Sequence, residues 1–368
     1  MNPINPMNPM NPTNPINPIN PTNPINQNRS KKFLITIDVE DWFQVENFKP
    51  WIPFETWGRR ELRIERNVHR LLDMFDTISL APSPIGSIKS TNALFSVAQS
   101  STSRLKATFF VLGWVAEKVP HLVREIIARG HEVASHGCRH DLPLKMSINL
   151  LRKDLADSRK KLEAMTGKPI IGFRAPSFSI DDKILRSVAE AGYTYDSSFN
   201  SFCLNRRYGR VSVNGRSKKG IARKISGNFY ELPISNLDMK HLTRAFFSRY
   251  GKNINGVNSI ENFLEATSKW GLVLPWGGGG YFRLIPNNLF KAGVEAILNE
   301  DGVYIFYIHP WEIDPDQPRI KNLTFSRRFR HYANLQETEG KLMEMVERFG
   351  YCEFMTCSEY VSRLESGK

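Results

Sequence analysis

Short apolar segments alternate with amphipathic segments along most of the chain. The apolar runs are rich in β-branched and aromatic residues, as buried strands are, and lie at 33–37, 107–112, 170–173, 229–234, 271–275 and 303–308. The amphipathic runs have the spacing of helices with one buried face, and lie near 61–76, 115–129, 147–166, 181–192, 259–269 and 287–299. This alternation predicts an α/β fold with short parallel strands, either an open doubly wound sheet or a closed barrel.

Two segments interrupt this alternation. Residues 1–27 repeat Asn-Pro-x, and a proline at every third position removes backbone donors and prevents a core-facing side from forming. We therefore treat residues 1–30 as a disordered tail outside the fold. A stretch rich in Ser, Ala, Thr and Pro at 77–104 separates a predicted helix from the next strand, and we interpret it as a surface insertion.

The composition is that of a globular protein with a basic surface. With 368 residues, of which 41% are hydrophobic, the chain can bury the core of one large domain or two small ones. Lys and Arg outnumber Asp and Glu by 50 to 37, which gives a formal net charge of +13. The basic residues are scattered and no nucleic-acid-binding module accompanies them, so we predict a solvated basic surface and no nucleic-acid partner.

Cysteine usage and hydropathy bear on the compartment. The four cysteines, at 138, 203, 352 and 357, lack Cys-x-x-Cys spacing and the density of a disulfide scaffold, so we expect reduced thiols. The N-terminus lacks a charged stretch followed by an apolar one, and no apolar run reaches the length of a membrane span. We therefore expect a cytoplasmic protein, with peripheral association at the inner membrane left open.

The clearest chemical signal is a pair of histidines, His136 and His140, four residues apart after a short apolar run. About a hundred residues earlier, the first predicted strand ends in the acidic cluster Asp38-Val39-Glu40-Asp41. One carboxylate and two imidazoles form a facial site that suits zinc or a similar divalent ion and leaves coordination positions open. The pattern therefore predicts metal-assisted hydrolysis.

Three further polar residues, Arg174, Asp196 and His309, also follow predicted strands. The carboxyl ends of parallel strands meet at one edge of a sheet, where active sites of α/β proteins form. Any one of these positions alone would be a weak signal. Together with the acidic cluster and the histidine pair they indicate a single site.

The order of these motifs resembles that of polysaccharide deacetylases of the NodB-homology (carbohydrate esterase 4-like) type. The resemblance covers residues 32–312 and rests on Thr36-Ile37-Asp38-Val39-Glu40-Asp41, His136-x-x-x-His140, Arg174-Ala175-Pro176, Asp196-Ser197-Ser198 and Tyr307-Ile308-His309-Pro310. Two more segments resemble the subgroup found with exosortase-linked (PEP-CTERM) exopolysaccharide loci, namely 276–283 and 309–314 with the following tail to about 360. The resemblance implies a distorted (β/α)7 barrel over 31–315, with a subgroup-specific helical extension over 316–368 that packs on it.

The resemblance also implies catalytic roles. Asp38 falls at the position of the catalytic base, which takes a proton from the attacking water, and Arg174 at that of the arginine that pairs with the base. His309 falls at the position of the general acid that protonates the leaving amine. Asp196 would hydrogen-bond His309 and raise its pKa, although Asp196-Ser197 also has the pattern of a plain turn.

Two metal ligands, His136 and His140, follow from the same resemblance, whereas the carboxylate ligand is less direct. The commonest family pattern has two adjacent aspartates, and this chain departs from it. Glu40 is favoured because side chains alternate in an extended chain, which puts Asp38 and Glu40 on one side. Asp41 is the alternative. Gly137 replaces the Ser or Thr common in the motif, which we expect to make the loop less rigid.

Five residues are expected to contact substrate. The resemblance implies that Pro176 and Ser177 lie at the acetyl group, where the Ser177 N–H would stabilise the oxyanion. Trp276, Gly279 and Tyr281 flank or belong to a glycine run that suits close approach of a sugar, and tight turns packed against the barrel are an equal alternative. Trp42, Phe43, Trp51 and Trp57 either line a glycan groove or are buried aromatic residues of a long loop.

The predicted function is removal of N-acetyl groups from N-acetylhexosamine units of an exopolysaccharide or its lipid-linked precursor. The expected cofactor is Zn²⁺, with Co²⁺ or a similar ion as an alternative. Two other functions stay open at this point. One is hydrolysis of small cyclic amides by an allantoinase-like enzyme, and the other is glycan binding by a non-catalytic barrel.

Overall fold

The computed structural model describes residues 31–78, 104–202, 205, 207–212, 218–238 and 273–366. The predicted disordered tail at 1–30, nearly all of the predicted insertion at 77–104 and the predicted helix at 259–269 lie outside these residues. Cys203 also lies outside them. The three other cysteines, Cys138, Cys352 and Cys357, carry free thiols, as expected.

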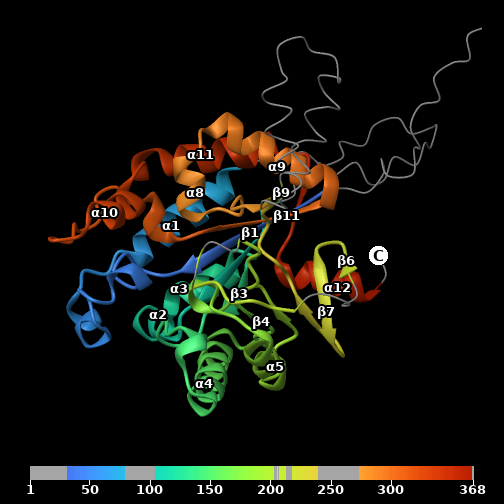
Figure 1. Ribbon diagram of the computed structural model, residues 1–368, viewed down its shortest axis with the longest axis horizontal. Coiled ribbons are helices and arrows are strands. Elements are labelled where there is room, and N and C mark those ends of the chain that lie inside the picture. Colours follow the sequence, from blue (N-terminus) through green and yellow to red (C-terminus); the bar gives the residue numbers. More distant parts are fainter. Residues whose placement is uncertain are drawn as a thin grey trace, which may run out of the picture.

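A curled, mainly parallel sheet forms the centre of the fold (Figure 1). Its strands, in spatial order, are β11 (Val303–Ile308), β1 (Lys32–Val39), β2 (Ala107–Val111), β3 (Glu132–Ser135), β4 (Gly172–Phe173), β5 (Tyr195–Asp196), β8 (Phe229–Glu231), β7 (Ala222–Ser226) and β6 (Lys218–Lys219). Pairing is parallel from β11 to β8 and antiparallel among β8, β7 and β6. Two short strands, β9 (Leu237–Asp238) and β10 (Val273–Leu274), form a separate antiparallel pair. The architecture is a half-barrel, and the predicted α/β barrel class is confirmed.

The sheet has an inner and an outer face because side chains alternate along each strand. On β1, Ile35 and Ile37 belong to the large core beneath the helices, whereas Leu34 belongs to a smaller core inside the curl. Asp38 follows Leu34 at even spacing and is therefore directed to the inner side. The alternation of side chains along β1 therefore places the polar side chains near its end on the inside of the half-barrel.

Helices cover the outer face. In Figure 1 α2 (Gly113–Lys118), α3 (Pro120–Ala128), α4 (Ile148–Thr166) and α5 (Asp182–Glu190) lie below the sheet, and α1 (Ile64–Thr77), α8 (Gly279–Leu284), α9 (Asn287–Asp301), α10 (Phe325–Tyr332) and α11 (Leu335–Arg348) lie above it. The amphipathic run predicted at 115–129 is two helices, because Pro120 lacks an N–H and starts α3 at its first turn. Among the described residues, no helix combines the length and apolar character that crossing a membrane requires.

The last part of the chain closes the half-barrel at the amino ends of its strands. β12 (Glu353–Phe354) pairs in parallel with the start of β1, and α12 (Cys357–Ser366) follows it. Cys357 N–H donates to Thr108 Oγ1 at 2.9 Å at the beginning of β2. The polar side chains of the candidate site lie at the opposite end of the half-barrel, where the parallel strands finish. The division into domains at residue 315 stays a prediction.

Candidate active site

Glu40, His136 and His140 form a compact, buried group at the carboxyl ends of β1 and β3. Glu40 Oε1 lies 3.0 Å from His136 Nε2 and 2.9 Å from His140 Nε2. Burial raises the pKa of Glu40, but the charges of His140 and His309 and hydrogen bonds from both loop histidines outweigh it and hold the pKa well below its ordinary value. The ligand atoms of Glu40, His136 and His140 all lie within 4.8 Å of one another, so these three residues can hold a metal ion. Two nitrogen donors and one carboxylate fit zinc or a similar divalent ion.

The loop after β3 holds the two imidazoles in place. His136 Nδ1 bonds the carbonyl oxygen of Arg174 at 2.8 Å, which directs Nε2 toward Glu40. Gly137 has a φ of +75°, and a Cβ there would lie 2.8 Å from Asp154 Oδ2. Asp154 Oδ1 accepts the Cys138 N–H at 3.1 Å. A carboxylate from α4 therefore fills the place expected for a side chain at 137 and supports the loop in its stead.

Asp41, the alternative ligand, lies away from the histidines. Its carboxylate accepts the backbone N–H groups of Trp42, Arg63 and Ile64 at 2.8, 2.8 and 3.0 Å. Burial raises the pKa of Asp41 to about 6, although these N–H groups lower it. Asp41 thus caps the start of α1, and the structure brings Glu40 to the histidines instead.

Asp38 and Arg174 form a buried ion pair beside the Glu40 group. Arg174 Nη1 donates to Asp38 Oδ1 and to Thr36 Oγ1, both at 2.7 Å. The rest of the guanidinium donates to the carbonyl and hydroxyl oxygens of Ser197 and stacks over Phe110, with 4.1 Å to the ring centroid. Arg174 is thereby fixed on all sides and holds one oxygen of Asp38, which leaves Oδ2 directed into the pocket.

His309, at the end of β11, faces the same space. Its Nε2 lies 3.9 Å from both Asp38 Oδ2 and Glu40 Oε1, and its Nδ1 lies 2.7 Å from Glu312 Oε1. Glu312 in turn accepts from Arg283 Nε at 2.6 Å. Burial lowers the pKa of His309, but the carboxylates of Glu40, Glu312 and Asp38 outweigh this effect and raise the pKa to about 9. The three carboxylates thus favour the protonated form of the His309 imidazole.

The expected pairing of Asp196 with His309 is wrong, because Glu312 occupies that position. Asp196 is the register partner of Glu231 on β8, and both are fully buried. Burial raises the pKa of Asp196 to about 7, although hydrogen bonds with Ser198 and Glu231 lower it, and burial together with the Asp196 charge raises that of Glu231 well above its ordinary value. The raised pKa values favour a protonated carboxyl in this buried pair, which lies at the ends of β5 and β8 and not beside His309.

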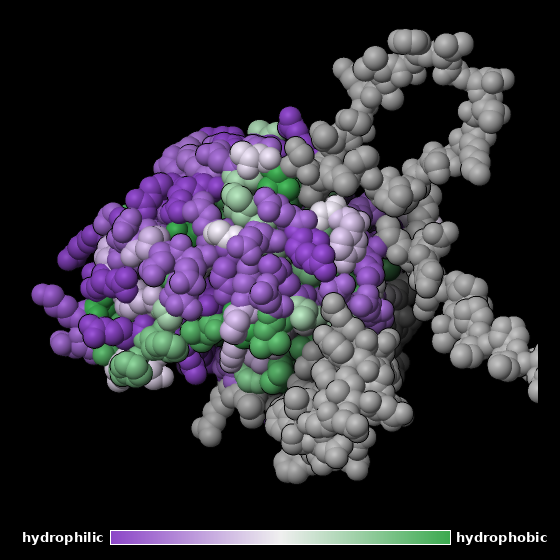
Figure 2. All heavy atoms as spheres, turned by 90° about the horizontal axis from the view of Figure 1, so that it is seen from above, coloured by the Kyte–Doolittle hydropathy of each residue, from purple (hydrophilic) through white to green (hydrophobic). Residues whose placement is uncertain are grey.

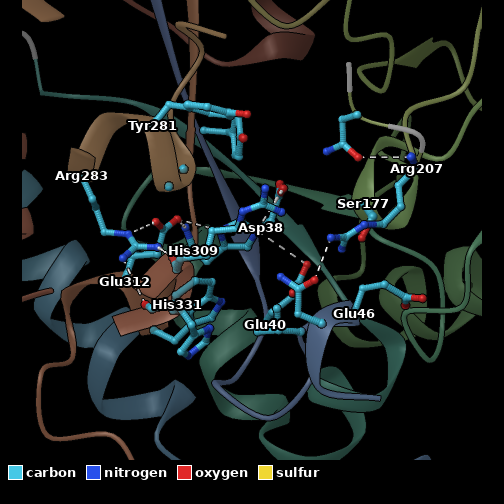
Figure 3. A pocket seen from close by; sticks show the side chains of 18 of the residues that line it. Asp38, Glu40, Glu46, Ser177, Arg207, Tyr281, Arg283, His309, Glu312 and His331 are labelled. Carbon is cyan, nitrogen blue, oxygen red and sulfur yellow. Dashed lines mark hydrogen bonds and ion pairs between the residues drawn. The ribbon is translucent and has the colours of Figure 1, made fainter. Parts of the chain in front are cut away.

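A pocket of about 380 Å³ opens above these groups, within the ~300–1,000 Å³ range of small-molecule sites. Figure 3 shows Asp38 and Glu40 between Ser177 on one side and His309, Glu312 and Arg283 on the other. Of the residues expected at substrate, Ser177, Gly279 and Tyr281 line this pocket. Ser177 adopts a left-handed φ of +53° in the turn after Arg174.

Other residues expected at substrate belong to the protein interior. Trp276 is 5% exposed, donates its indole N–H to the Phe290 carbonyl at 2.8 Å and stacks on that ring, so its predicted sugar contact is wrong. Pro176 is buried beside Gly137 and does not line the pocket. Trp42, Phe43 and Trp57 are buried as well, in agreement with the alternative of loop aromatics.

The sequence analysis did not assign Glu312, Arg283 or Arg207 to the site, although all three line the pocket. Glu312 lies three residues after His309, and Pro310 starts a 3-10 turn (Pro310–Ile313) that returns its carboxylate to the imidazole. That spacing could have indicated the pair. Arg207 lies in a segment without periodicity, and no signal in the sequence could have found it.

Comparison with known proteins agrees with this geometry. Residues 88–195 match the family described as polysaccharide deacetylase, and residues 253–361 match a domain of unknown function, DUF3473. The chain is 32% identical over 90 residues to a peptidoglycan-N-acetylglucosamine deacetylase of Bacillus cereus and 37% identical over 90 residues to a chitooligosaccharide deacetylase of Sinorhizobium fredii. Each match covers 24% of this chain and 42% of the relative, so the chain spans less than half of these relatives.

The whole fold is similar to that of a solved protein. The crystal structure of a Mycobacterium smegmatis protein assigned as a polysaccharide deacetylase superposes with a TM-score of 0.53 and 16% identity, over 92% of each chain. At this identity the likeness concerns the fold alone. The chain is therefore similar in sequence to polysaccharide deacetylases over residues 88–195, and its fold is similar to that of a solved protein assigned to the same activity.

Proposed function

We propose that the protein is a metal-dependent N-deacetylase that hydrolyses N-acetyl groups of N-acetylhexosamine units in a polysaccharide. The observation that carries the proposal is the meeting of Asp38, His309 and the Glu40–His136–His140 group at one pocket, with His309 Nε2 3.9 Å from both Asp38 and Glu40. A base, an acid and a set of metal ligands are the parts that metal-assisted amide hydrolysis requires.

Glu40, His136 and His140 would hold the ion, which we propose to be Zn²⁺. A divalent ion bound there supplies Lewis acidity, which polarises the amide carbonyl and makes water a better nucleophile at neutral pH. Asp38, held by Arg174, accepts the proton of the attacking water at Oδ2. The Ser177 backbone N–H is proposed as a donor to the developing oxyanion.

His309 completes the reaction at its Nε2. As the carbon–nitrogen bond breaks, the protonated imidazole donates a proton to the departing nitrogen, so that acetate and a free sugar amine are formed. Glu312 and Arg283 keep the ring in the orientation and protonation state that this step needs. The reaction therefore consumes one water molecule, breaks one amide bond and requires two proton transfers.

The finer substrate assignment rests on the subgroup resemblance. The segment that matches DUF3473, residues 253–361, contains both motifs typical of exosortase-linked loci, and this supports an exopolysaccharide or its lipid-linked precursor as the substrate. We further propose a cytoplasmic location, with peripheral contact to the inner membrane for a lipid-linked substrate. Both candidate substrates contain an oligosaccharide with N-acetylhexosamine units.

Acetate release from N-acetylglucosamine oligomers tests this function. Metal-stripped protein should release little acetate, and addition of zinc or cobalt should restore release. Bound metal without acetate release would favour another amide substrate, such as a cyclic amide. Failure to bind metal at all would favour a glycan-binding barrel.

A further inference from the structure

The charges that line the pocket do not balance. Each carboxylate at its surface has a basic partner: Asp38 pairs with Arg174, Glu40 with the two loop histidines, Glu312 with Arg283 and Glu46 with Lys49. Two arginines that line the same pocket, Arg207 and Arg330, pair with no carboxylate among the described residues. Arg207 and Arg330 therefore form no ion pair with a described acidic side chain, although the charge of Glu46 acts on Arg207 from a longer distance.

Arg207 is held in position without being neutralised. Its Nη2 donates to Asn47 Oδ1 at 2.7 Å, and its backbone N–H donates to Asn205 Oδ1 at 3.1 Å. A guanidinium has five N–H donors, and Asn47 is a neutral acceptor that uses one of them. Among the described residues, no other group accepts from the Arg207 guanidinium, so its remaining donors can serve a ligand, and the Asn47 contact already orients the side chain.

Arg330 lines the same pocket from α10. Arg283, which pairs with Glu312, also donates to the carbonyl oxygens of Arg330 and His331 at 2.8 and 3.1 Å, so the end of this helix is fixed to the acid side of the site. Burial lowers the pKa of Arg207, the charges of Glu46 and Tyr208 oppose this, and the like charges of Arg330 and Arg327 lower it further. Two guanidinium groups that line one pocket and repel each other are stabilised by an anion that both can contact.

We propose that Arg207 and Arg330 bind an anionic substituent, a carboxylate or a phosphate, that the substrate carries beside the N-acetyl group. The inference rests on the proposed function and narrows its substrate to acidic N-acetylated sugars. Figure 3 supports the geometry, since Arg207 lies beside Ser177 and Glu46, across the pocket from Arg283 and Glu312, with Asp38 and Glu40 between them. A sugar placed with its amide at Asp38 would then present a neighbouring substituent to Arg207. Planar, bidentate recognition of carboxylate or phosphate is the chemistry that arginine serves best.

Three probes separate the two anion sources from a neutral sugar. These are triacetylchitotriose, which is neutral, an N-acetylglucosaminuronic acid oligomer, which carries carboxylates, and N-acetylglucosamine 1-phosphate. Dissociation constants are measured by calorimetry on the full-length, zinc-loaded Asp38→Asn protein, so that no probe is consumed. One acidic probe should bind at least tenfold more tightly than the neutral probe, as expected for a charge-assisted contact of roughly 1.5–3 kcal/mol. The preferred acidic probe identifies the group as carboxylate or phosphate.

Variants assign the preference to the two arginines. Arg207→Gln should remove the preference for the acidic probe and leave binding of the neutral probe within about twofold, whereas Arg207→Lys should retain part of it. Arg330→Gln should weaken the same preference, and Arg328→Gln is its matched control, because Arg328 also lies on α10 and is exposed but does not line the pocket. Equal binding of all three probes, no binding of any, or an equal loss for all of them in Arg207→Gln would overturn the inference.

The readouts distinguish this inference from the proposed function. Acetate release by the wild-type protein reports on the function, while calorimetry on the Asp38→Asn protein reports on anion recognition alone. Absence of acetate release from every probe would reject the deacetylase, and the calorimetric comparison would still decide the anion site. Acetate release at equal kcat/KM from neutral and acidic probes would reject the anion site and leave the deacetylase in place.

Discussion

His309 Nδ1 and Glu312 Oε1 lie 2.7 Å apart, and the other oxygen of Glu312 accepts from Arg283. The turn that starts at Pro310 makes this contact local, since Glu312 also accepts the His309 backbone N–H at 3.2 Å. Trp311 stacks on the imidazole with 5.3 Å between ring centroids. The ring is therefore fixed with Nε2 toward Asp38 and Glu40, which is the orientation a proton donor to substrate needs.

Replacing Glu312 should weaken the acid. In Glu312→Gln the carboxylate that helps to raise the pKa of His309 is lost, so the pKa falls from about 9. Activity that needs the protonated ring is lost as pH rises through this pKa, and the alkaline limb of the kcat profile should therefore move to lower pH. We expect kcat at pH 8 to fall about ten- to hundredfold. An unchanged pH profile, with Glu347→Gln as an exposed control, would argue that Glu312 serves only the fold.

Asp38→Asn should separate catalysis from metal binding. Asparagine keeps the shape of the side chain and an acceptor for Arg174, but it cannot accept the proton of water. We expect kcat to fall by about 10²–10⁴, with metal content near that of the wild type. His136→Ala should instead lose the metal, because it removes one of three ligand atoms. Metal content by mass spectrometry and acetate release measure both, and substantial activity in Asp38→Asn would rule out Asp38 as the base.

Variants of the neighbouring residues Glu40 and Asp41 should have different effects, one on zinc affinity and the other on stability. Glu40→Gln weakens a ligand atom, so we expect a loss of zinc affinity of at least tenfold. Asp41→Asn replaces one of two oxygens that together accept three backbone N–H groups, two of them at the start of α1, so it should lower the free energy of unfolding by about 1–2 kcal/mol and leave zinc affinity unchanged. Zinc titration and urea unfolding of the two proteins provide the comparison. Loss of zinc affinity in Asp41→Asn but not in Glu40→Gln would reverse the assignment.

The sequence predicted the site best where a residue ends a regular strand. Asp38 lies near the end of β1, and His136, Arg174 and His309 directly follow strands; parallel pairing brings all four to one end of the sheet. The alternation along β1 also favoured Glu40 over Asp41, since a one-residue change reverses the face of a strand side chain. Their roles as base, acid and ligands stay proposals until they are measured.

Contacts between irregular segments could not be predicted. Two-residue strands such as β4 and β5 are too short for a hydrophobic period, and Glu312 reaches His309 only because of a 3-10 turn. Trp276 is an aromatic residue beside a glycine run, as sugar-binding residues often are, but the ring of Phe290, 14 residues later in the chain, covers it. Burial of an aromatic residue depends on such distant partners, which local pattern does not contain.

The Asp196–Glu231 pair should make stability depend on pH. The pKa of Asp196 is about 7 in the folded protein against 3.8 ordinarily, so the folded state binds the proton more tightly than the unfolded chain. The free energy of unfolding therefore falls as pH rises from about 4 through about 7. In Asp196→Asn the amide can donate to Glu231, and the fall should be smaller. Urea unfolding of both proteins at pH 5 and pH 8 measures this fall in the free energy of unfolding. An equal fall in the wild type and in Asp196→Asn would contradict a shared proton.

The most direct test of the central claim is a titration of metal-free protein with zinc while acetate release from triacetylchitotriose is followed. We predict that the rate rises in proportion to added zinc up to one equivalent per chain and then stays constant, and that His136→Ala shows no such rise. Acetate release by the metal-free protein at the full rate, or none with one zinc bound and with every N-acetylated sugar tested, would contradict a metal-dependent deacetylase.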